Sequence, residues 1–299
     1  MKLIYSDHYD LNLGDHVFPS VKYRLVREKL LEEQLVSEVD FVGPQPAEDE
    51  DVLRVHTAEY VQKLKTGTLS AEEIYHMEIP YSSKLVRAVW LCAGGSIMAA
   101  RFALAESLAV NVGGGFHHAF PGHGEGFCVI HDVAIAIRKL QSEGAIERAM
   151  TVDLDVHHGN GTATIFARDA SVCTFSMHQE NNYPLEKPPS DFDIHLPDGC
   201  GDDPYLHLLR QNLHHALSVF HPQLIFYLAG ADPYRGDQLG GLSLSQKGLQ
   251  ERDRFLFTLA RERSIPVAVT LAGGYAARVE DTVAIHVATV RSALESLAS

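Results

Sequence analysis

Short apolar segments alternate with amphipathic segments along most of the chain. Five apolar runs are rich in β-branched and aromatic residues and are followed by glycine or polar residues, as buried parallel strands are. They cover residues 108–112, 149–156, 171–177, 224–230 and 267–273. Between them, apolar residues recur at helical spacing over residues 83–104, 131–141, 205–220 and 246–261. This alternation predicts an α/β fold with a parallel sheet.

Two polar, proline-containing stretches interrupt this pattern. Residues 41–51 contain Pro44, Pro46 and an acidic run, and residues 181–203 contain several more prolines. Both stretches are predicted to be long loops, and neither has the composition of a flexible linker between domains. We therefore expect residues 1–299 to form a single domain, because a chain of this length buries a sizeable core.

Polar side chains of chemically useful types follow four of the predicted strands. They are His117 and His118, then Asp155, His157 and His158, then Asp232, and finally Tyr275. In open parallel sheets, ligands bind in the crevice beyond the carboxyl ends of the strands. Four segments that deliver such side chains to one edge of the sheet indicate a functional site there.

The second of these segments has the pattern of a metal site. In TVDLDVHHGNG (151–161), Asp153, Asp155 and His157 alternate with apolar residues and so project to one face of a strand. Buried polar groups are costly without a partner, and a divalent cation supplies one. With Asp232, Asp155 and His157 form an N and O ligand set that leaves an open position, as in catalytic zinc sites. Fe²⁺ accepts the same set. Alone, the motif more often marks a strand end that caps loop amides, and the other segments at the same edge reverse this preference in favour of a metal site.

Adjacent histidines follow the first predicted strand through three glycines, in GGGFHHA (113–119). Glycine permits positive φ and a close approach of the backbone to a ligand. A histidine near a metal-activated water acts as a general base. His117 and His118 then each need an acceptor that fixes the tautomer, and Asp153 and Asn160 are the candidates. A solvated histidine pair is the alternative.

Tyr275 follows the last predicted strand, in LAGGYAA (271–277). Its phenol is placed to donate a hydrogen bond to an oxyanion that develops opposite the metal. The alternative is an ordinary buried tyrosine with a satisfied hydroxyl. Its position at the same edge as the metal ligands favours the catalytic role.

Taken together, these motifs resemble the histone deacetylase family. The matching segments, in the family's order, are GGGFHHAFPGHGEGFC, VDLDVHHGNG, FSMH, AGADPYRGDQLGGLSLS and LAGGY, and the similarity extends over nearly the whole chain. The resemblance implies a single-domain arginase/deacetylase-like fold with a central, mostly parallel eight-stranded sheet. It also implies a narrow tunnel that accepts an acylated lysine or amine.

The resemblance also implies roles for individual residues. Asp155, His157 and Asp232 match the zinc ligands, and His117, His118 and Tyr275 match the catalytic groups, with His118 as the base. Asp153 matches the partner of His117, and Asn160 stands as the partner of His118 where nuclear class I enzymes have Asp. A structural K⁺ is implied at Asp153, Asp155, His157, Ser176 and Met177, and tunnel walls are implied at Gly126, Phe127, Tyr183 and Leu239.

NVGGGFHH and GDQLGGLSLS look closest to the small class IV branch, which is associated with removal of long fatty acyl groups. The glycines at 113–115 and 240–241 place small residues beside the expected site, where larger side chains would close a pocket. We therefore expect a preference for longer acyl chains. A short pocket, with the glycines serving only backbone turns, is the alternative.

Composition restricts the partners. The formal net charge of −14 disfavours nucleic acid and anionic membranes but suits cationic substrates. No apolar run was expected to span a membrane, and four cysteines without a CxxC pair are typical of a reduced, cytoplasmic protein. The sequence leaves the oligomeric state open.

The favoured function is zinc-dependent hydrolysis of N-acyl-lysine. Three alternatives remain at this stage: an acetylpolyamine or other small-molecule amidohydrolase, an arginase-type ureohydrolase, and a non-catalytic acyl-lysine binding module. The last would be expected to lack Tyr275, His118 or a metal ligand, and all are present. A ureohydrolase needs two metals and a richer set of Asp and His residues than the single DxDxH segment offers.

Overall fold

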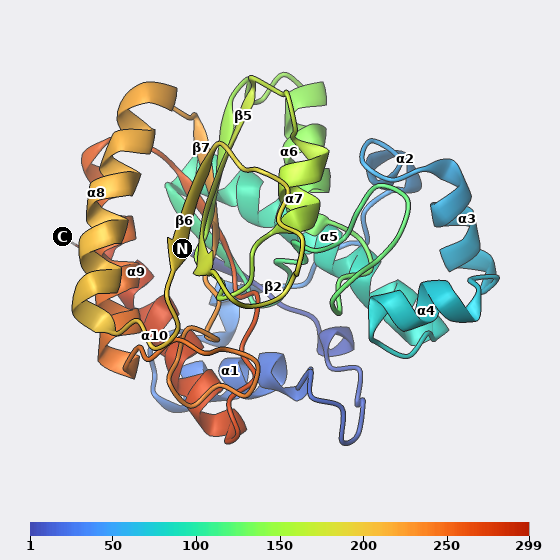
Figure 1. The fold of residues 1–299 in the computed structure, drawn as a ribbon, viewed down its shortest axis with the longest axis horizontal. Helices are drawn as coiled ribbons and strands as arrows, with labels where there is room; N and C mark the ends of the chain where they lie inside the picture. The colour runs from blue at the N-terminus through green and yellow to red at the C-terminus, as the bar shows by residue number, and fades with distance from the viewer. Residues whose placement is uncertain (299) are drawn as a thin grey trace.

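The centre of the molecule is a sheet of eight parallel strands, seen in a computed structural model that describes residues 1–298 (Figure 1). The strands are β1 (Lys2–Ile4), β2 (Phe41–Val42), β3 (Leu108–Asn111), β4 (Ala149–Asp153), β5 (Val172–Gln179), β6 (Phe192–Leu196), β7 (Leu224–Leu228) and β8 (Val267–Thr270). Their order across the sheet is β2-β1-β3-β8-β7-β4-β5-β6. The expected eight-stranded parallel architecture is confirmed.

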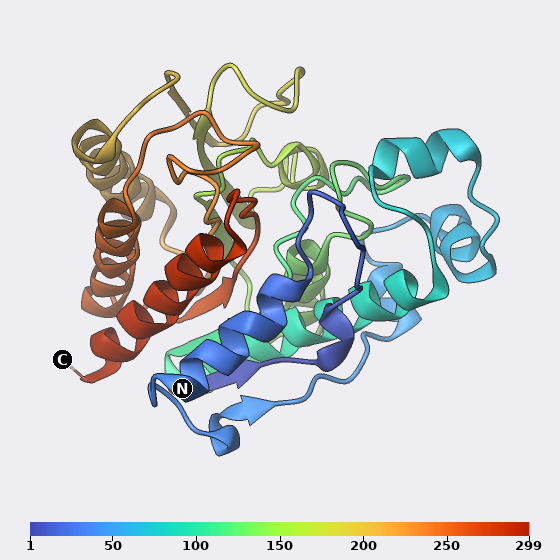
Figure 2. The same ribbon diagram turned by 90° about the horizontal axis from the view of Figure 1, so that it is seen from below.

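Helices cover both faces of this sheet. They are α1 (Val21–Glu32), α2 (Asp49–Val52), α3 (Ala58–Thr66), α4 (Ala71–Met77), α5 (Ser83–Glu106), α6 (Asp132–Ser142), α7 (Asn160–Ile165), α8 (Asp202–Phe220), α9 (Gln246–Glu262) and α10 (Val279–Ala298), with short 3₁₀ turns at Asp7–Tyr9 and Glu38–Asp40. Helices α8, α9 and α10 lie on one side, with α1 packed beside α10, while α5 and α6 lie on the other (Figures 1 and 2). Helices α2, α3 and α4 form a separate group at the edge of the molecule (Figure 1).

The long helix α5 is apolar because it lies in the core. Its first turn is capped by Ser82, whose hydroxyl accepts a hydrogen bond from the amide of Leu85 at 3.1 Å. It packs against β1, β3, β8 and α6. By length and composition alone, α5 is the one helix of the described residues that could cross a bilayer. Most of its apolar window is buried inside the fold instead.

The five predicted strands and four predicted helices are all present, with shifts of a few residues at their ends. The two predicted long loops are wrong in part. The first contains β2 and the start of α2, and the second contains β6. Strand β6 was missed because Asp193 and His195 make its short sequence look polar. Their side chains occupy one face of an edge strand, where polar groups are tolerated.

Candidate metal centre and substrate pocket

Four neighbouring strands bring the predicted site residues together. Strands β3, β8, β7 and β4 are adjacent in the sheet and parallel, so their carboxyl ends share one edge. The loop after β3 carries His117 and His118, and the loop after β8 carries Tyr275. The loops after β7 and β4 carry the three predicted metal ligands. All six of these side chains are at least nine-tenths buried.

The predicted metal ligands form one compact group. The ligand atoms of Asp155, His157 and Asp232 all lie within 4.8 Å of one another. Nδ1 of His157 is 3.0 Å from Oδ1 of Asp155 and 3.6 Å from Oδ2 of Asp232. The expectation that Asp155 and His157 continue the strand is wrong, because β4 ends at Asp153. Both residues lie in the loop beyond it, and their ligand atoms still meet that of Asp232.

The donor set fits a divalent cation. The remaining oxygens of the two carboxylates are held by backbone amides: Gly273 donates to Asp155 and Val156 donates to Asp232, both at 2.8 Å. Oδ2 of Asp232 is buried without a hydrogen-bond partner among the described residues. Burial and the charge of Asp155 raise the pKa of Asp232 to about 7, as expected for surplus buried negative charge. A cation bound here would relieve that charge.

His117 is paired with a carboxylate. Its Nδ1 lies 2.6 Å from Oδ2 of Asp153, the last residue of β4. Burial alone would lower the pKa of His117, but the charges of Asp153 and Asp155 outweigh it and raise the pKa to about 9. The structure thus brings together His117 and its predicted partner.

His118 is paired with a neutral amide. Its Nδ1 lies 2.7 Å from Oδ1 of Asn160, which begins α7. The side-chain amide nitrogen of Asn160 donates to the carboxylate of Glu125 at 2.7 Å. The same carboxylate accepts from the hydroxyl of Tyr183, also at 2.7 Å. Because Asn160 accepts from Nδ1, the lone pair of His118 is left on Nε2. Burial and the neighbouring charges of His117 and His157 hold the pKa of His118 well below its usual value.

A pocket of about 200 Å³ leads to these groups. It is lined by Glu78, His118, Gly126, Phe127, His157, Asn182, Tyr183, Leu239 and Tyr275. All four predicted tunnel residues are among them. The rings of His118 and Tyr183 are 4.9 Å apart, and a Cβ at Gly126 would lie 2.9 Å from His118 and 3.0 Å from Tyr183. Gly126 therefore keeps this wall of the pocket narrow.

A smaller cavity, of about 20 Å³, adjoins the same residues and reaches Gly114 and Gly115. That volume holds roughly one water molecule. The space that glycine was expected to leave for a long acyl chain is otherwise filled. A Cβ at Gly113 would lie 2.8 Å from the ring of Tyr9, and one at Gly115 would lie 2.8 Å from Cβ of Ala272. The glycines at 240 and 241 likewise meet protein atoms. These contacts favour a shorter pocket, and the acyl-chain preference stays a prediction.

The suspected potassium ligands lie next to one another at the β4–β5 pair. Asp153 is directly opposite Ser176 in the register, and Met177 follows Ser176 on the same strand. The hydroxyl of Ser176 is also 2.8 Å from Nδ1 of His178. The suspected ligands are neighbours, but the Ser176 hydroxyl already has a protein partner, so the potassium site stays a prediction.

Several residues of the site were not predicted from the sequence, among them Glu125, Glu78 and Lys22. Glu125 holds both Asn160 and Tyr183, and Glu78 lines the pocket. Lys22, fully buried in α1, donates at 2.8 Å to the carbonyl oxygen of Ala272 in the loop that carries Tyr275. A buried lysine on a helix of otherwise ordinary charge pattern gives no sign of this contact. Glu125 lies within a segment that resembles the family, and its carboxylate between glycines was the available signal.

Comparison with known proteins agrees with this geometry. A model of the histone deacetylase domain matches residues 16–290. An uncharacterized protein of Picosynechococcus sp. (strain PCC 7002) is 42% identical over 272 residues, which cover 91% of each chain. Histone deacetylase 2 of Arabidopsis thaliana is 33% identical over 288 residues, covering 92% of this chain and 74% of the relative.

Among solved structures, the crystal structure of the HDA15 HD domain has the same fold. Its TM-score is 0.84 at 23% identity, and the match covers 98% of this chain and 88% of that one. The strand order, the residues gathered at the edge of the sheet and the match to the family model lead to one conclusion: the chain belongs to the histone deacetylase family.

Proposed function

We propose that the protein is a metal-dependent amidohydrolase that removes acyl groups from lysine side chains. The observation that carries the proposal is the convergence of Asp155, His157 and Asp232 beside His118 and Tyr275 at the base of one pocket. Zn²⁺ is the favoured metal and Fe²⁺ the second choice, because the donors are nitrogen and oxygen. When bound, the metal polarises the acyl carbonyl and makes water more acidic.

The side chains supply the proton transfers. Nε2 of His118 takes a proton from the attacking water while the new carbon–oxygen bond forms. The hydroxyl of Tyr275 donates to the developing oxyanion. His118 then gives its proton to the leaving nitrogen as the carbon–nitrogen bond breaks. The products are a carboxylate and a free amine. His117, held by Asp153, contributes positive charge beside the reacting centre.

Replacement of a metal ligand tests this proposal. Asp232→Asn keeps the side-chain volume but removes the negative charge, so bound zinc and hydrolysis of acetyl-lysine peptides are both expected to fall sharply. Zinc is measured by elemental analysis and hydrolysis by amine release. Asp203→Asn, on an exposed residue of α8, is the matched control and should change neither quantity. Full activity in the Asp232→Asn protein would refute the ligand assignment.

We further propose a preference for short acyl groups, in place of the longer chains favoured by the class IV-like motifs. The small cavity adjoining Tyr275, about 20 Å³, supports this. Acetyl, octanoyl and myristoyl forms of one peptide should show kcat/KM falling with chain length. A rise with chain length would instead support the long-acyl preference and require this cavity to expand.

A second candidate, deacetylation of acetylpolyamines or similar cationic amides, is favoured by Glu78. This exposed carboxylate lines the pocket, and the half-buried carboxylate of Glu125 accepts a hydrogen bond from Tyr183, which also lines it. Negative charge at the entrance of a pocket attracts cationic substrates. Glu78→Gln should raise KM for acetylpolyamines more than for uncharged acyl-peptides; equal effects would argue against this candidate.

Three finer assignments are also proposals. Placement in the class IV branch is supported by NVGGGFHH and GDQLGGLSLS. A structural K⁺ is supported by the pairing of Asp153 with Ser176. A reducing, cytoplasmic location is supported by the four cysteines, all buried and free of disulfides.

A further inference from the structure

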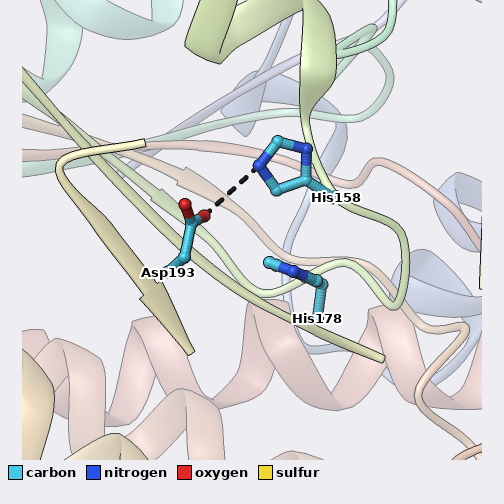
Figure 3. Close-up of side chains that lie close together, drawn as sticks. All are labelled: His158, His178 and Asp193. Carbon is cyan, nitrogen blue, oxygen red and sulfur yellow. Dashed lines mark ion pairs between the residues drawn. The ribbon is translucent and has the colours of Figure 1, made fainter. Parts of the chain in front are cut away.

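A second group of potential metal ligands lies outside the proposed catalytic centre. It consists of His158, His178 and Asp193, whose ligand atoms all lie within 4.8 Å of one another (Figure 3). His158 comes from the segment between β4 and α7, His178 from β5 and Asp193 from β6. No step of the proposed hydrolysis uses these residues.

The strand register explains why two of the ligands meet. Strands β5 and β6 are parallel, with Ser176 opposite Asp193 and His178 opposite His195. Side chains two residues apart share a face, so all four project to the same side of the sheet edge. His158 approaches this face from the loop after the neighbouring strand β4, and its ring centroid lies 4.7 Å from that of His178.

The polar atoms of this group are incompletely satisfied by protein partners. Nε2 of His158 is 3.2 Å from Oδ1 of Asp193, as the dashed line in Figure 3 shows. Even so, Oδ1 of Asp193 is buried without a hydrogen-bond partner among the described residues. His158 is completely buried. Burying a polar atom without a hydrogen-bond partner costs free energy. The unpartnered carboxylate oxygen therefore indicates that a ligand binds here.

The chemistry of the donors suits a transition-metal cation. Two imidazoles and a carboxylate are typical ligands of Zn²⁺. Nδ1 of His178 is engaged by Ser176, so Nε2, which pairs with Nδ1 of His195, is the atom that remains as a metal ligand. Nδ1 of the exposed His195 lies 2.9 Å from Nε2 of His178 and offers a fourth donor.

We propose that His158, His178 and Asp193 form a second, structural Zn²⁺ site, with His195 completing the coordination. The site would tie β5 and β6 to the loop after β4. That loop also holds His157, the direct neighbour of His158. A cation at this position would therefore fix the backbone beside the catalytic centre without contacting substrate.

Zinc stoichiometry in four variants tests the proposal. The protein is purified with zinc, dialysed into metal-free buffer and analysed for zinc per chain. We expect about two zinc ions in the wild type and about one in each of Asp193→Asn and Asp232→Asn, since each removes one ligand set. The double variant should hold almost none. His214→Gln, an exposed histidine on α8, should keep the wild-type content.

The Asp232→Asn arm keeps the proposal testable even if Asp193→Asn fails to fold. A folded Asp232→Asn protein that retains about one zinc, lost on adding His178→Gln, supports the second site. The proposal is overturned if folded Asp232→Asn holds no zinc, or if wild type and folded Asp193→Asn hold equal amounts. Hydrolysis is not part of this readout, so the result is independent of the proposed deacylase activity.

Discussion

At the scale of single residues, Tyr275 illustrates how packing positions a reactive group. Its ring packs at 5.8 Å from that of Phe127 and 6.4 Å from that of Phe18, measured between centroids. Lys22 holds the preceding backbone through Ala272. These contacts orient the side chain through its ring and backbone, so its hydroxyl can be removed with little disturbance.

Tyr275→Phe should therefore lower kcat/KM while folding and zinc content stay near those of the wild type. Loss of one oxyanion donor typically costs about 10²–10³ in rate. The measurement is steady-state hydrolysis of an acetyl-lysine peptide. A decrease of less than about fivefold would mean that Tyr275 is not the oxyanion donor.

The two histidines should respond differently to truncation. In His118, Nδ1 is bound to the neutral amide of Asn160 and Nε2 is left to take a proton. In His117, Nδ1 is bound to the carboxylate of Asp153. His118→Ala is expected to reduce kcat/KM more than His117→Ala, because His118 is assigned the proton transfer. The reverse order, measured with zinc content matched, would exchange the two roles.

Gly273 lies against both metal-binding carboxylates. A Cβ at this position would overlap Oδ2 of Asp232 and crowd Oδ2 of Asp155. Gly273→Ala is therefore expected to displace these ligands and lower zinc content at the catalytic centre, which elemental analysis can detect. Gly122→Ala, where a Cβ meets no atom within 4 Å, should leave zinc unchanged. Equal zinc content in the Gly273→Ala and Gly122→Ala proteins would show that the two carboxylates still bind the metal when a Cβ displaces them.

At the scale of elements, α9 supports the loops that carry the metal ligands. Arg252 of α9 is completely buried and donates to the carbonyl oxygens of Gly230 and Leu154, at 2.7 and 3.3 Å. These carbonyls lie in the loops after β7 and β4. Its Nε also donates to Asp253 at 2.8 Å. One helix thus fixes the spacing of two ligand-bearing loops.

Arg252→Met should destabilise the protein strongly. Removing one partner of a buried ion pair typically costs about 3–5 kcal/mol, because the remaining charge is left uncompensated. Urea denaturation measures this free energy of unfolding. Arg254→Met, on the exposed part of the same helix, should cost less than about 1 kcal/mol. Similar losses for both variants would mean that the buried pair has no special role.

Much of this arrangement could be predicted from the sequence, and the exceptions have physical causes. Buried strands are apolar throughout, so β3, β4, β5, β7 and β8 were predictable, as were the polar residues that follow them. The contact between Arg252 and two distant loops was not, because a charged residue on a helix resembles a solvated one until the packing is known. The pairing that makes β6 and the His158 group depends on register, which periodicity alone does not give.

At the scale of the whole molecule, His56 links segments that are distant in sequence. Its Nδ1 is 3.0 Å from the carbonyl oxygen of Phe120, and its Nε2 accepts from the amide of His131 at 2.9 Å. Both nitrogens are used by the neutral ring, so protonation would break the second bond. Burial lowers the pKa of His56 from 6.5 to about 4.

Stability should therefore fall as the solution is acidified. Between pH 6.5 and about 4, the unfolded chain binds a proton at His56 that the folded chain does not, so the free energy of unfolding decreases as pH decreases in this window. The contribution is at most roughly 3 kcal/mol. His56→Gln, which keeps a donor and an acceptor, should reduce the difference in unfolding free energy between pH 7 and pH 4.5. An unchanged difference would assign the acid sensitivity to other groups.

The position of β8 affects how the protein acquires activity during synthesis. Among the strands of the described residues, β8 is the last to be synthesised, yet it alone joins β3 to β7 in the sheet order. Before it emerges, the nascent chain holds His117 and His118 on one part of the sheet and the metal ligands on the other, with no strand between them. Catalytic competence should therefore arise only after β8 has been synthesised, and earlier nascent chains should expose two apolar strand edges to which chaperones bind.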